Sequence, residues 1–263
     1  MTLSPALDRL LAAQPPFRPG EVWLAGAGPG GADCLTLGVA AALAAADAVV
    51  YDALVDPTVI ALAEKAEHHF VGKRGGRPSI KQPAINQLLV DLAGAGKRVL
   101  RLKGGDPFLF GHGGDEALAL TRAGVPFRVL PGVTAASGAA AAAVIPTTMR
   151  GVNKAIILVT GHAAARDDDV DWAALAASGQ PMVIYMGLRN LPLITAALLA
   201  GGLDPATPAA AVMSATLPDQ NVVVSTLGAI AGAVARAGLH APSLIFIGDI
   251  VDLRAQLLPM LAP

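Results

Sequence analysis

The chain has 263 residues and a net charge of −1, and 54% of its residues are apolar, 15% charged and 4% aromatic. A chain this apolar can bury enough surface to offset its conformational entropy, which excludes intrinsic disorder. The mean hydropathy of +0.56 raises the question of a membrane span. Alanine and glycine dominate that average, however, and we find no run of about 20 strongly apolar residues. The first 20 residues lack the basic start and apolar core of a signal peptide. We therefore expect a soluble protein with a core of small side chains.

The cysteine, histidine and charge patterns argue against several kinds of functional site. Cys34 is the only cysteine and the five histidines lack ligand spacing, so we expect a reduced, cytoplasmic protein without disulfide or bound metal. Eight of the 19 basic residues lie between Lys73 and Lys103, against one acid, Asp91. This segment is either a solvated basic face or a site for an anionic small molecule. Scarce aromatics and a pI of about 6.5 argue against nucleic acid as a partner.

Hydrophobic periodicity predicts alternating strands and helices in two α/β halves. In the first half we expect strands at 22–26, 48–51, 69–71, 98–102 and 127–130, and helices at 35–46, 85–95 and 115–122. These continuous apolar runs between helices favour parallel strands covered on both faces. An alanine-rich segment at 131–146 follows and is predicted to pack as a helix. In the second half we expect strands at 155–160, 182–186, 209–212, 222–224 and 244–247, and helices at 172–177, 190–200 and 227–237. The predicted divisions are an N-terminal extension at 1–20, a domain at 21–134, a connecting segment at 135–150 and a second domain at 151–263.

Two glycine-rich loops follow predicted strands of the first half. Residues 26–31 fit G-x-G-x-x-G, and Asp52 ends the next strand, where dinucleotide-binding folds carry a ribose-binding acid. Taken alone, this pattern favours a nicotinamide or flavin oxidoreductase. The second loop reads K-G-G-D-P-F-L-F-G at 103–111, and a dinucleotide fold has no need of it. Because open α/β sheets bind ligands at the carboxyl ends of their strands, Asp106 in this loop is a candidate to accept hydrogen bonds from a ligand's amine or ribose.

Further motifs extend along most of the chain. They read V-W-L-A-G-A-G-P-G (22–30), Y-D-A-L-V (51–55), V-G-K-R (71–74), R-L-K-G-G-D-P-F-L-F-G (101–111), P-G-V-T-A-A-S-G (131–138), V-T-G-H (159–162), I-Y-M-G (184–187) and T-P-A-A-A-V (207–212). This set resembles the uroporphyrinogen-III C-methyltransferases of sirohaem and cobalamin synthesis from about residue 21 to residue 252. The glycine loops and the T-P segment are shared by the wider tetrapyrrole methyltransferase class. The combination of Y-D-x-L-V, V-G-K-R and K-G-G-D-P-F-x-F-G is more specific.

The resemblance implies two α/β domains with S-adenosylmethionine in the cleft between them, usually in a homodimer. It assigns cofactor contacts to Pro29, Gly104, Gly105, Asp106, Leu109, Thr134, Ala135, Met186, Ala215, Pro242 and Ser243. Asp52 and Lys73 fall where the family's proposed proton acceptor and donor lie. Three positions depart from the family pattern: Gly31 replaces an acid, His112 an arginine and Asp115 a glutamate.

The implied reaction methylates uroporphyrinogen III at C2 and C7 and gives precorrin-2 through precorrin-1. The substrate is a polycarboxylate, which gives the basic segment a purpose. Candidates for binding its carboxylates are Arg74, Arg77, Arg101, Lys103, Arg150 and Lys154, with Met149 beside the ring. Three alternatives remain open at this point: methylation of a later precorrin, an oxidoreductase that uses NAD or FAD, and a non-catalytic anion-binding protein.

Overall fold

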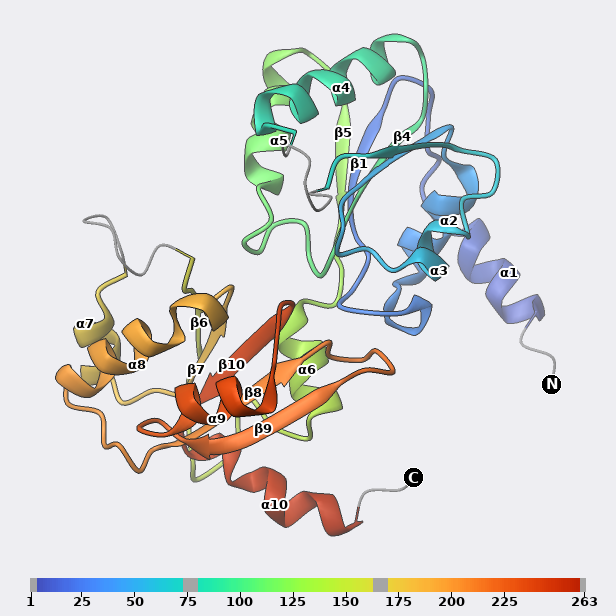
Figure 1. Cartoon of the computed structure of the whole chain (residues 1–263). Coiled ribbons are helices and arrows are strands. Elements are labelled where there is room, and N and C mark those ends of the chain that lie inside the picture. The colour runs from blue at the N-terminus through green and yellow to red at the C-terminus, as the bar shows by residue number, and fades with distance from the viewer. Residues whose placement is uncertain (1–3, 73–79, 163–169, 261–263) are drawn as a thin grey trace. The chain divides into compact units, whose positions relative to one another are not determined.

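The computed structural model describes residues 4–72, 80–162 and 170–260. The chain divides into two compact units, Met1–Ala135 and Ala136–Pro263, each with its own sheet and helices (Figure 1). Within the described ranges no helix is long and apolar enough to cross a membrane.

The first unit is built on a parallel five-stranded sheet in the order β3-β2-β4-β1-β5. Its strands are β1 (Val22–Gly26), β2 (Ala48–Tyr51), β3 (Glu67–Phe70), β4 (Val99–Lys103) and β5 (Phe127–Leu130). Its helices are α1 (Ser4–Ala12), α2 (Leu37–Ala45), α3 (Pro57–Ile60), α4 (Gln82–Gly94) and α5 (Gly113–Arg122), with a 3₁₀ helix η1 at Ala32–Cys34. The five predicted strands and three predicted helices are all present, whereas α1 and α3 are not predicted from the sequence.

Two apolar cores cover the faces of this sheet. On one face, Trp23, Val49 and Leu100 pack with Val39 of α2 and Val59 of α3. On the other face, strand residues alternate with that set and pack against α4 and α5 through Leu24, Val50, Val99, Ile85, Leu89 and Leu120. Because neither face of such a strand meets water, its residues do not alternate between apolar and polar, which explains the continuous apolar sequence. The prediction of parallel strands covered on both faces is confirmed.

The second unit carries a mixed five-stranded sheet in the order β6-β7-β10-β8-β9. Its strands are β6 (Ile157–Thr160), β7 (Met182–Tyr185), β8 (Pro208–Met213), β9 (Asn221–Thr226) and β10 (Ser243–Ile247). Its helices are α6 (Ala135–Ala142), α7 (Trp172–Ala177), α8 (Leu191–Ala200), α9 (Ile230–Ala237) and α10 (Leu253–Leu257), with 3₁₀ helices at Leu188–Asn190, Asp249–Val251 and Leu258–Met260. The pair β6–β7 is parallel, and β10 pairs antiparallel with both β7 and β8, as β8 does with β9. We make no prediction of strand direction for this unit from the sequence; β8 and β9 are joined without an intervening helix, which suits an antiparallel pair.

An ion pair between β2 and β4 at their amino ends makes a testable contribution to stability. Arg98 donates from Nε to Asp47 Oδ2 at 2.9 Å and from Nη2 to Oδ1 at 2.7 Å, and its backbone N–H also bonds Oδ2. These bonds from Arg98 lower the pKa of Asp47 from 3.8 to about 2. A lowered carboxyl pKa stabilises the fold above pH 4, and that contribution is lost as the pH falls from about 4 toward 2.

We expect Asp47→Asn to lower the free energy of unfolding at pH 7 by roughly 1 kcal/mol, a value reduced for the partial solvent exposure of the pair. Urea denaturation of both proteins between pH 7 and pH 3 measures the effect. The difference between them should shrink below pH 4. A difference that stays constant down to pH 3 would mean that the pair is not linked to proton binding.

Candidate active site

Glycines bring the loops after β1, β4 and β5 into backbone contact at the carboxyl edge of the first sheet. Gly28 and Gly105 exchange hydrogen bonds, with Gly105 N to Gly28 O at 2.7 Å and Gly28 N to Gly105 O at 3.2 Å. A Cβ on Gly26 would lie 2.6 Å from Gly132 Cα, and one on Gly132 would lie 2.7 Å from Gly26 Cα. Real Cβ atoms do not approach that closely, and Gly105 also has a φ of +68°. The glycines are therefore required by the meeting of the loops.

Asp106 ties the second loop to the third. Its Oδ1 accepts from Phe108 N at 2.9 Å and its Oδ2 accepts from Gly132 N at 3.1 Å. Both carboxylate oxygens are thus engaged with backbone donors in this structure. A contact from Asp106 to a ligand remains a prediction, and the structure adds a second function, which is to hold the two loops together.

The other cofactor residues predicted in the first unit lie at the same edge. The position that a Cβ on Gly105 would take is 3.5 Å from Ala135 N and 3.9 Å from Thr134 Cα. Pro29, Leu109 and Thr134 are half-buried. The loop that contains Asp52 joins them, because a Cβ on Gly104 would meet Leu54 Cβ at 2.8 Å.

The cofactor residues predicted in the second unit also share one sheet edge. Met186 follows β7, Ala215 follows β8, and Pro242 precedes β10, whose first residue is Ser243. Ser214 N donates to Pro242 O at 3.0 Å, and Ser243 pairs with Met213 in the register of β10 and β8. Non-glycine residues with positive φ cluster there: Met186 (54°), Ser214 (47°) and Thr216 (69°). Such strained backbone concentrates at functional sites, and no sequence pattern used above reveals it.

These groups fit a nucleoside-sized cofactor. The first unit leaves part of the backbone at Gly104 exposed, together with the half-buried apolar surface of Pro29 and Leu109. A nucleoside needs this combination, because its ring requires apolar surface and its polar edges require a few directed hydrogen bonds.

The sheet order argues against the dinucleotide interpretation of the first glycine loop. In a dinucleotide-binding sheet the first strand lies next to the second, but here β4 lies between β1 and β2. Asp52 therefore does not follow the strand beside the loop at 26–31. A phosphate-binding helix must also begin at the glycines, whereas η1 intervenes and α2 begins only at Leu37. The nicotinamide or flavin alternative is thus unsupported by the fold.

Arg101, Lys103 and Glu116 form a buried charged cluster that the sequence does not predict. Arg101 is 3% exposed, Lys103 4% and Glu116 0%. Glu116 Oε1 accepts from Arg101 Nε at 2.9 Å and from Lys103 Nζ at 3.2 Å. Burial and the neighbouring Arg101 lower the pKa of Lys103, against the opposing effect of Glu116. The prediction that Arg101 and Lys103 bind substrate carboxylates is corrected here, because both side chains are buried and already paired.

The remaining predicted substrate residues divide into two sets. Lys73, Arg74 and Arg77 lie outside the described residues. Arg150 and Lys154 are exposed, and Met149 is 46% exposed.

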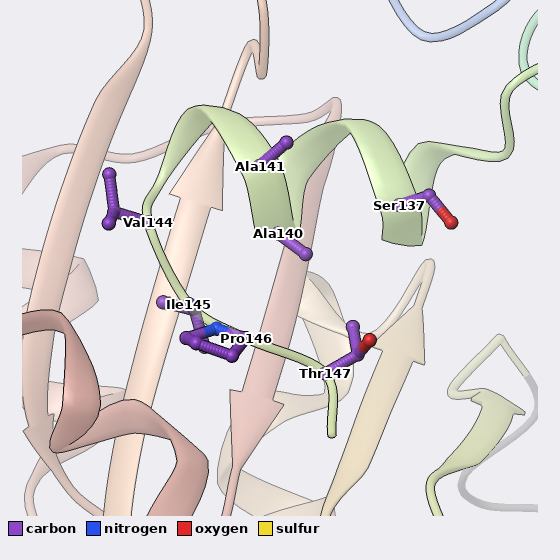
Figure 2. Close-up of a pocket in the computed structure, with 7 residues that line it drawn as sticks. All are labelled: Ser137, Ala140, Ala141, Val144, Ile145, Pro146 and Thr147. Atoms are coloured by element: carbon purple, nitrogen blue, oxygen red, sulfur yellow. The ribbon is translucent and has the colours of Figure 1, made fainter. Parts of the chain in front are cut away.

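A pocket of about 380 Å³ lies in the second unit and is lined by residues that precede Met149 in the sequence (Figure 2). Its lining residues come from α6 and the segment after it: Ser137, Ala140, Ala141, Val144, Ile145, Pro146 and Thr147. Val144 has a φ of +54°, which is rare for a β-branched residue. The pocket is mainly apolar, with hydroxyl groups only on Ser137 and Thr147 among the residues that line it.

Of the three departures from the family pattern, two form a local contact. His112 Nδ1 lies 2.9 Å from Asp115 Oδ2, and both residues are exposed at the start of α5. His112 has a φ of +59°. Gly31 has an ordinary φ of −68°, so its backbone conformation does not require glycine.

Comparisons with known proteins agree with this geometry. Residues 21–231 match the model of the tetrapyrrole (corrin/porphyrin) methylases. A uroporphyrinogen-III C-methyltransferase of Sinorhizobium sp is 48% identical over 95% of this chain and 91% of its own length. A sirohaem synthase of Azotobacter vinelandii is 47% identical over 95% of this chain, which spans only 54% of that protein. A uroporphyrin-III C-methyltransferase of Thermus thermophilus, solved with S-adenosylhomocysteine, matches with a TM-score of 0.77 and 37% identity over 89% of this chain and 99% of that one. This two-domain α/β chain therefore belongs to the tetrapyrrole (corrin/porphyrin) methylases.

Proposed function

We propose that this chain transfers methyl groups from S-adenosylmethionine to C2 and then C7 of uroporphyrinogen III, giving precorrin-2 for sirohaem or cobalamin synthesis. The observation that carries the proposal is the joining of the glycine loops after β1, β4 and β5 beside the loop of Asp52. The 48% identity to a uroporphyrinogen-III C-methyltransferase supports this substrate over a later precorrin. A homodimer and a cytoplasmic location belong to the same proposal.

The reaction requires the protein mainly to align the two reactants and to stabilise the charge that develops. The bound cofactor supplies an electrophilic methyl group on a sulfonium. A pyrrole carbon is electron-rich and needs no strong base, so most of the rate enhancement comes from orienting the two reactants. The loops around Gly104 and Gly105 would hold the cofactor for this purpose.

Asp52 is the proposed electrostatic partner of the pyrrole. Its side chain is 27% exposed, and its Oδ1 accepts from Leu54 N at 3.1 Å, which fixes the carboxylate at the end of β2. A carboxylate there would stabilise positive charge developing on the pyrrole nitrogen or accept its proton. Lys73, the second catalytic residue proposed from the resemblance, would protonate the macrocycle or pair with a substrate carboxylate.

Two exposed basic residues of the second unit, Arg150 and Lys154, are proposed to bind carboxylates of the substrate. Arg150 and Lys154 follow the apolar pocket closely in sequence, and Met149 exposes apolar surface beside them. This order suits a macrocycle with an apolar ring and charged arms. Arg74 and Arg77 complete the proposed set.

We expect Arg150→Ala to raise the KM for uroporphyrinogen III about tenfold with little change in kcat, because a charge-assisted hydrogen bond contributes roughly 1.5–3 kcal/mol. Arg236→Ala removes an exposed arginine from α9 of the same unit and serves as the control. Initial rates over a range of substrate concentrations measure both variants. Equal KM values in the two variants would remove Arg150 from the substrate site.

A binding titration tests the cofactor directly. We expect S-adenosylhomocysteine to bind the chain and NAD and FAD not to bind under the same conditions, as isothermal titration calorimetry can measure. A protein that purifies with bound flavin, or that binds NAD and ignores S-adenosylhomocysteine, would contradict the proposed function.

A further inference from the structure

The buried charged cluster continues to Asp52. Arg101 Nη2 lies 3.7 Å from Asp52 Oδ2, while its Nε donates to Glu116 Oε1 at 2.9 Å. The same guanidinium also donates from Nη1 to the backbone oxygens of Val50, at 3.3 Å, and Leu102, at 3.1 Å. A single planar group thus links a fully buried carboxylate on α5 to the partly exposed carboxylate at the end of β2.

Stability alone does not explain this arrangement. Removing charges from water costs several kcal/mol for each ion, and apolar side chains of similar volume often serve a core as well or better. Glu116 Oε1 takes contacts from Arg101, Lys103 and Gln82, while Oε2 has no hydrogen-bond partner among the described residues. Lys103 is the last residue of β4 and Asp52 follows β2, so the cluster reaches the carboxyl ends of parallel strands, where such sheets bind ligands.

We propose that Glu116 and Arg101 are positioning residues that set the orientation and the effective charge of the Asp52 carboxylate during methyl transfer. This inference rests on the proposed function, in which Asp52 faces the pyrrole. Arg101 fixes the position of the Asp52 carboxylate through their ion pair. Because Glu116 is paired with the same guanidinium, the negative charge of Asp52 is not fully neutralised. Lys103, also paired with Glu116, balances the charge of the cluster.

According to the proposal, the charge of Glu116 affects the Asp52 carboxylate through the guanidinium of Arg101, which lies between them. In Glu116→Gln the shape is kept, but Arg101 and Lys103 then have only Asp52 as an anionic neighbour in this cluster. The ion pair between Arg101 and Asp52 strengthens, and the carboxylate has less charge available for the pyrrole. Arg101→Lys keeps the positive charge but loses the planar fork that reaches both carboxylates at once.

The test compares turnover per folded site. We expect Glu116→Gln and Arg101→Lys each to lower kcat about tenfold or more, since a positioned acid or base contributes roughly 10²–10⁴-fold. The KM for uroporphyrinogen III and the Kd for S-adenosylhomocysteine should stay within about twofold of the original values. Titration with S-adenosylhomocysteine counts the folded sites. Glu116→Asp, which keeps the charge, should recover part of the kcat lost in Glu116→Gln.

Asp47→Asn is the matched control, because it breaks an ion pair between the same two strands at their other end. It should lower stability without changing kcat per site. If Glu116→Gln gives no folded protein, Arg101→Lys carries the test. If these variants keep the kcat per site of the original chain, or if only the KM for uroporphyrinogen III rises, the positioning role is overturned. Either result leaves the proposed function intact. An unsubstituted chain that binds S-adenosylhomocysteine yet methylates no tetrapyrrole overturns both.

Discussion

Gly132→Ala is expected to lower the free energy of unfolding by about 3 kcal/mol and to weaken S-adenosylhomocysteine binding about tenfold or more. The added Cβ would meet the backbone oxygen of Gly105 and would lie 2.7 Å from Gly26 Cα. These neighbours are backbone atoms of two other loops, which cannot rotate away as the end of a side chain would. The loops after β1, β4 and β5 must therefore separate, and the proposed cofactor surface separates with them.

Gly114→Ala is the control for this substitution. A Cβ on Gly114 has no neighbour within 4 Å, and the residue lies in the first turn of α5 without a positive φ. Its stability should be unchanged or raised by up to about 1 kcal/mol. Urea denaturation and calorimetric titration measure both variants. A Gly132→Ala protein as stable as the original, with unchanged affinity, would mean that the three loops are not held as described.

Asp106→Ala should weaken S-adenosylhomocysteine binding by an order of magnitude or more. The substitution removes the acceptors of two backbone N–H groups, on Phe108 and Gly132, and hydrogen bonds to a charged group contribute about 1.5–3 kcal/mol each. Without them the second and third loops lose their side-chain link, in addition to any direct contact between Asp106 and the cofactor.

Asp204→Ala provides the comparison for Asp106→Ala. Asp204 Oδ1 accepts from Ala206 N at 2.7 Å in a similar turn, but it precedes β8 and so lies at the opposite end of that strand from Ala215. We expect Asp204→Ala to lower stability by about 1 kcal/mol and to leave the affinity for S-adenosylhomocysteine unaltered. Should both variants bind as well as the original chain, Asp106 would have no part in the cofactor site.

The first unit is largely predictable from sequence because its central strands β1, β2 and β4 are buried on both faces. Val22–Gly26 and Ala48–Tyr51 read as short apolar runs between helices, and the structure has strands with these bounds. The order of the strands in the sheet, in contrast, is not predictable from the sequence. Nothing in the local pattern places β4 between β1 and β2, and that placement decides against the dinucleotide interpretation of the first glycine loop.

The candidate site shows a similar limit. The glycines and Asp106 are recognisable because backbone contact needs glycine and because the motif is specific. Arg101 and Lys103 look like surface cations in a basic segment, yet both are buried against Glu116. Their partner lies more than ten residues further along, on α5, and ordinary patterns assign a charged residue of a helix to its exposed face. Only the packing of α5 on the sheet reveals the pair.

The basic residues therefore fall into two groups, one paired with acids and one exposed. Arg98, Arg101 and Lys103 are occupied by acids of the first unit. Arg150 and Lys154 of the second unit are exposed, as is Met149, which follows the residues of the apolar pocket in sequence. The exposed set is the one that we propose to meet a polycarboxylate.

The most direct test is the mass of the product. The chain is incubated with S-adenosylmethionine and uroporphyrinogen III under anaerobic conditions, and the tetrapyrrole is analysed by mass spectrometry. We predict a gain of two CH₂ units, with two molecules of S-adenosylhomocysteine released for each tetrapyrrole. An unchanged mass, or a product that stops at one added methyl group, would contradict the assignment of uroporphyrinogen III as the substrate methylated at both C2 and C7.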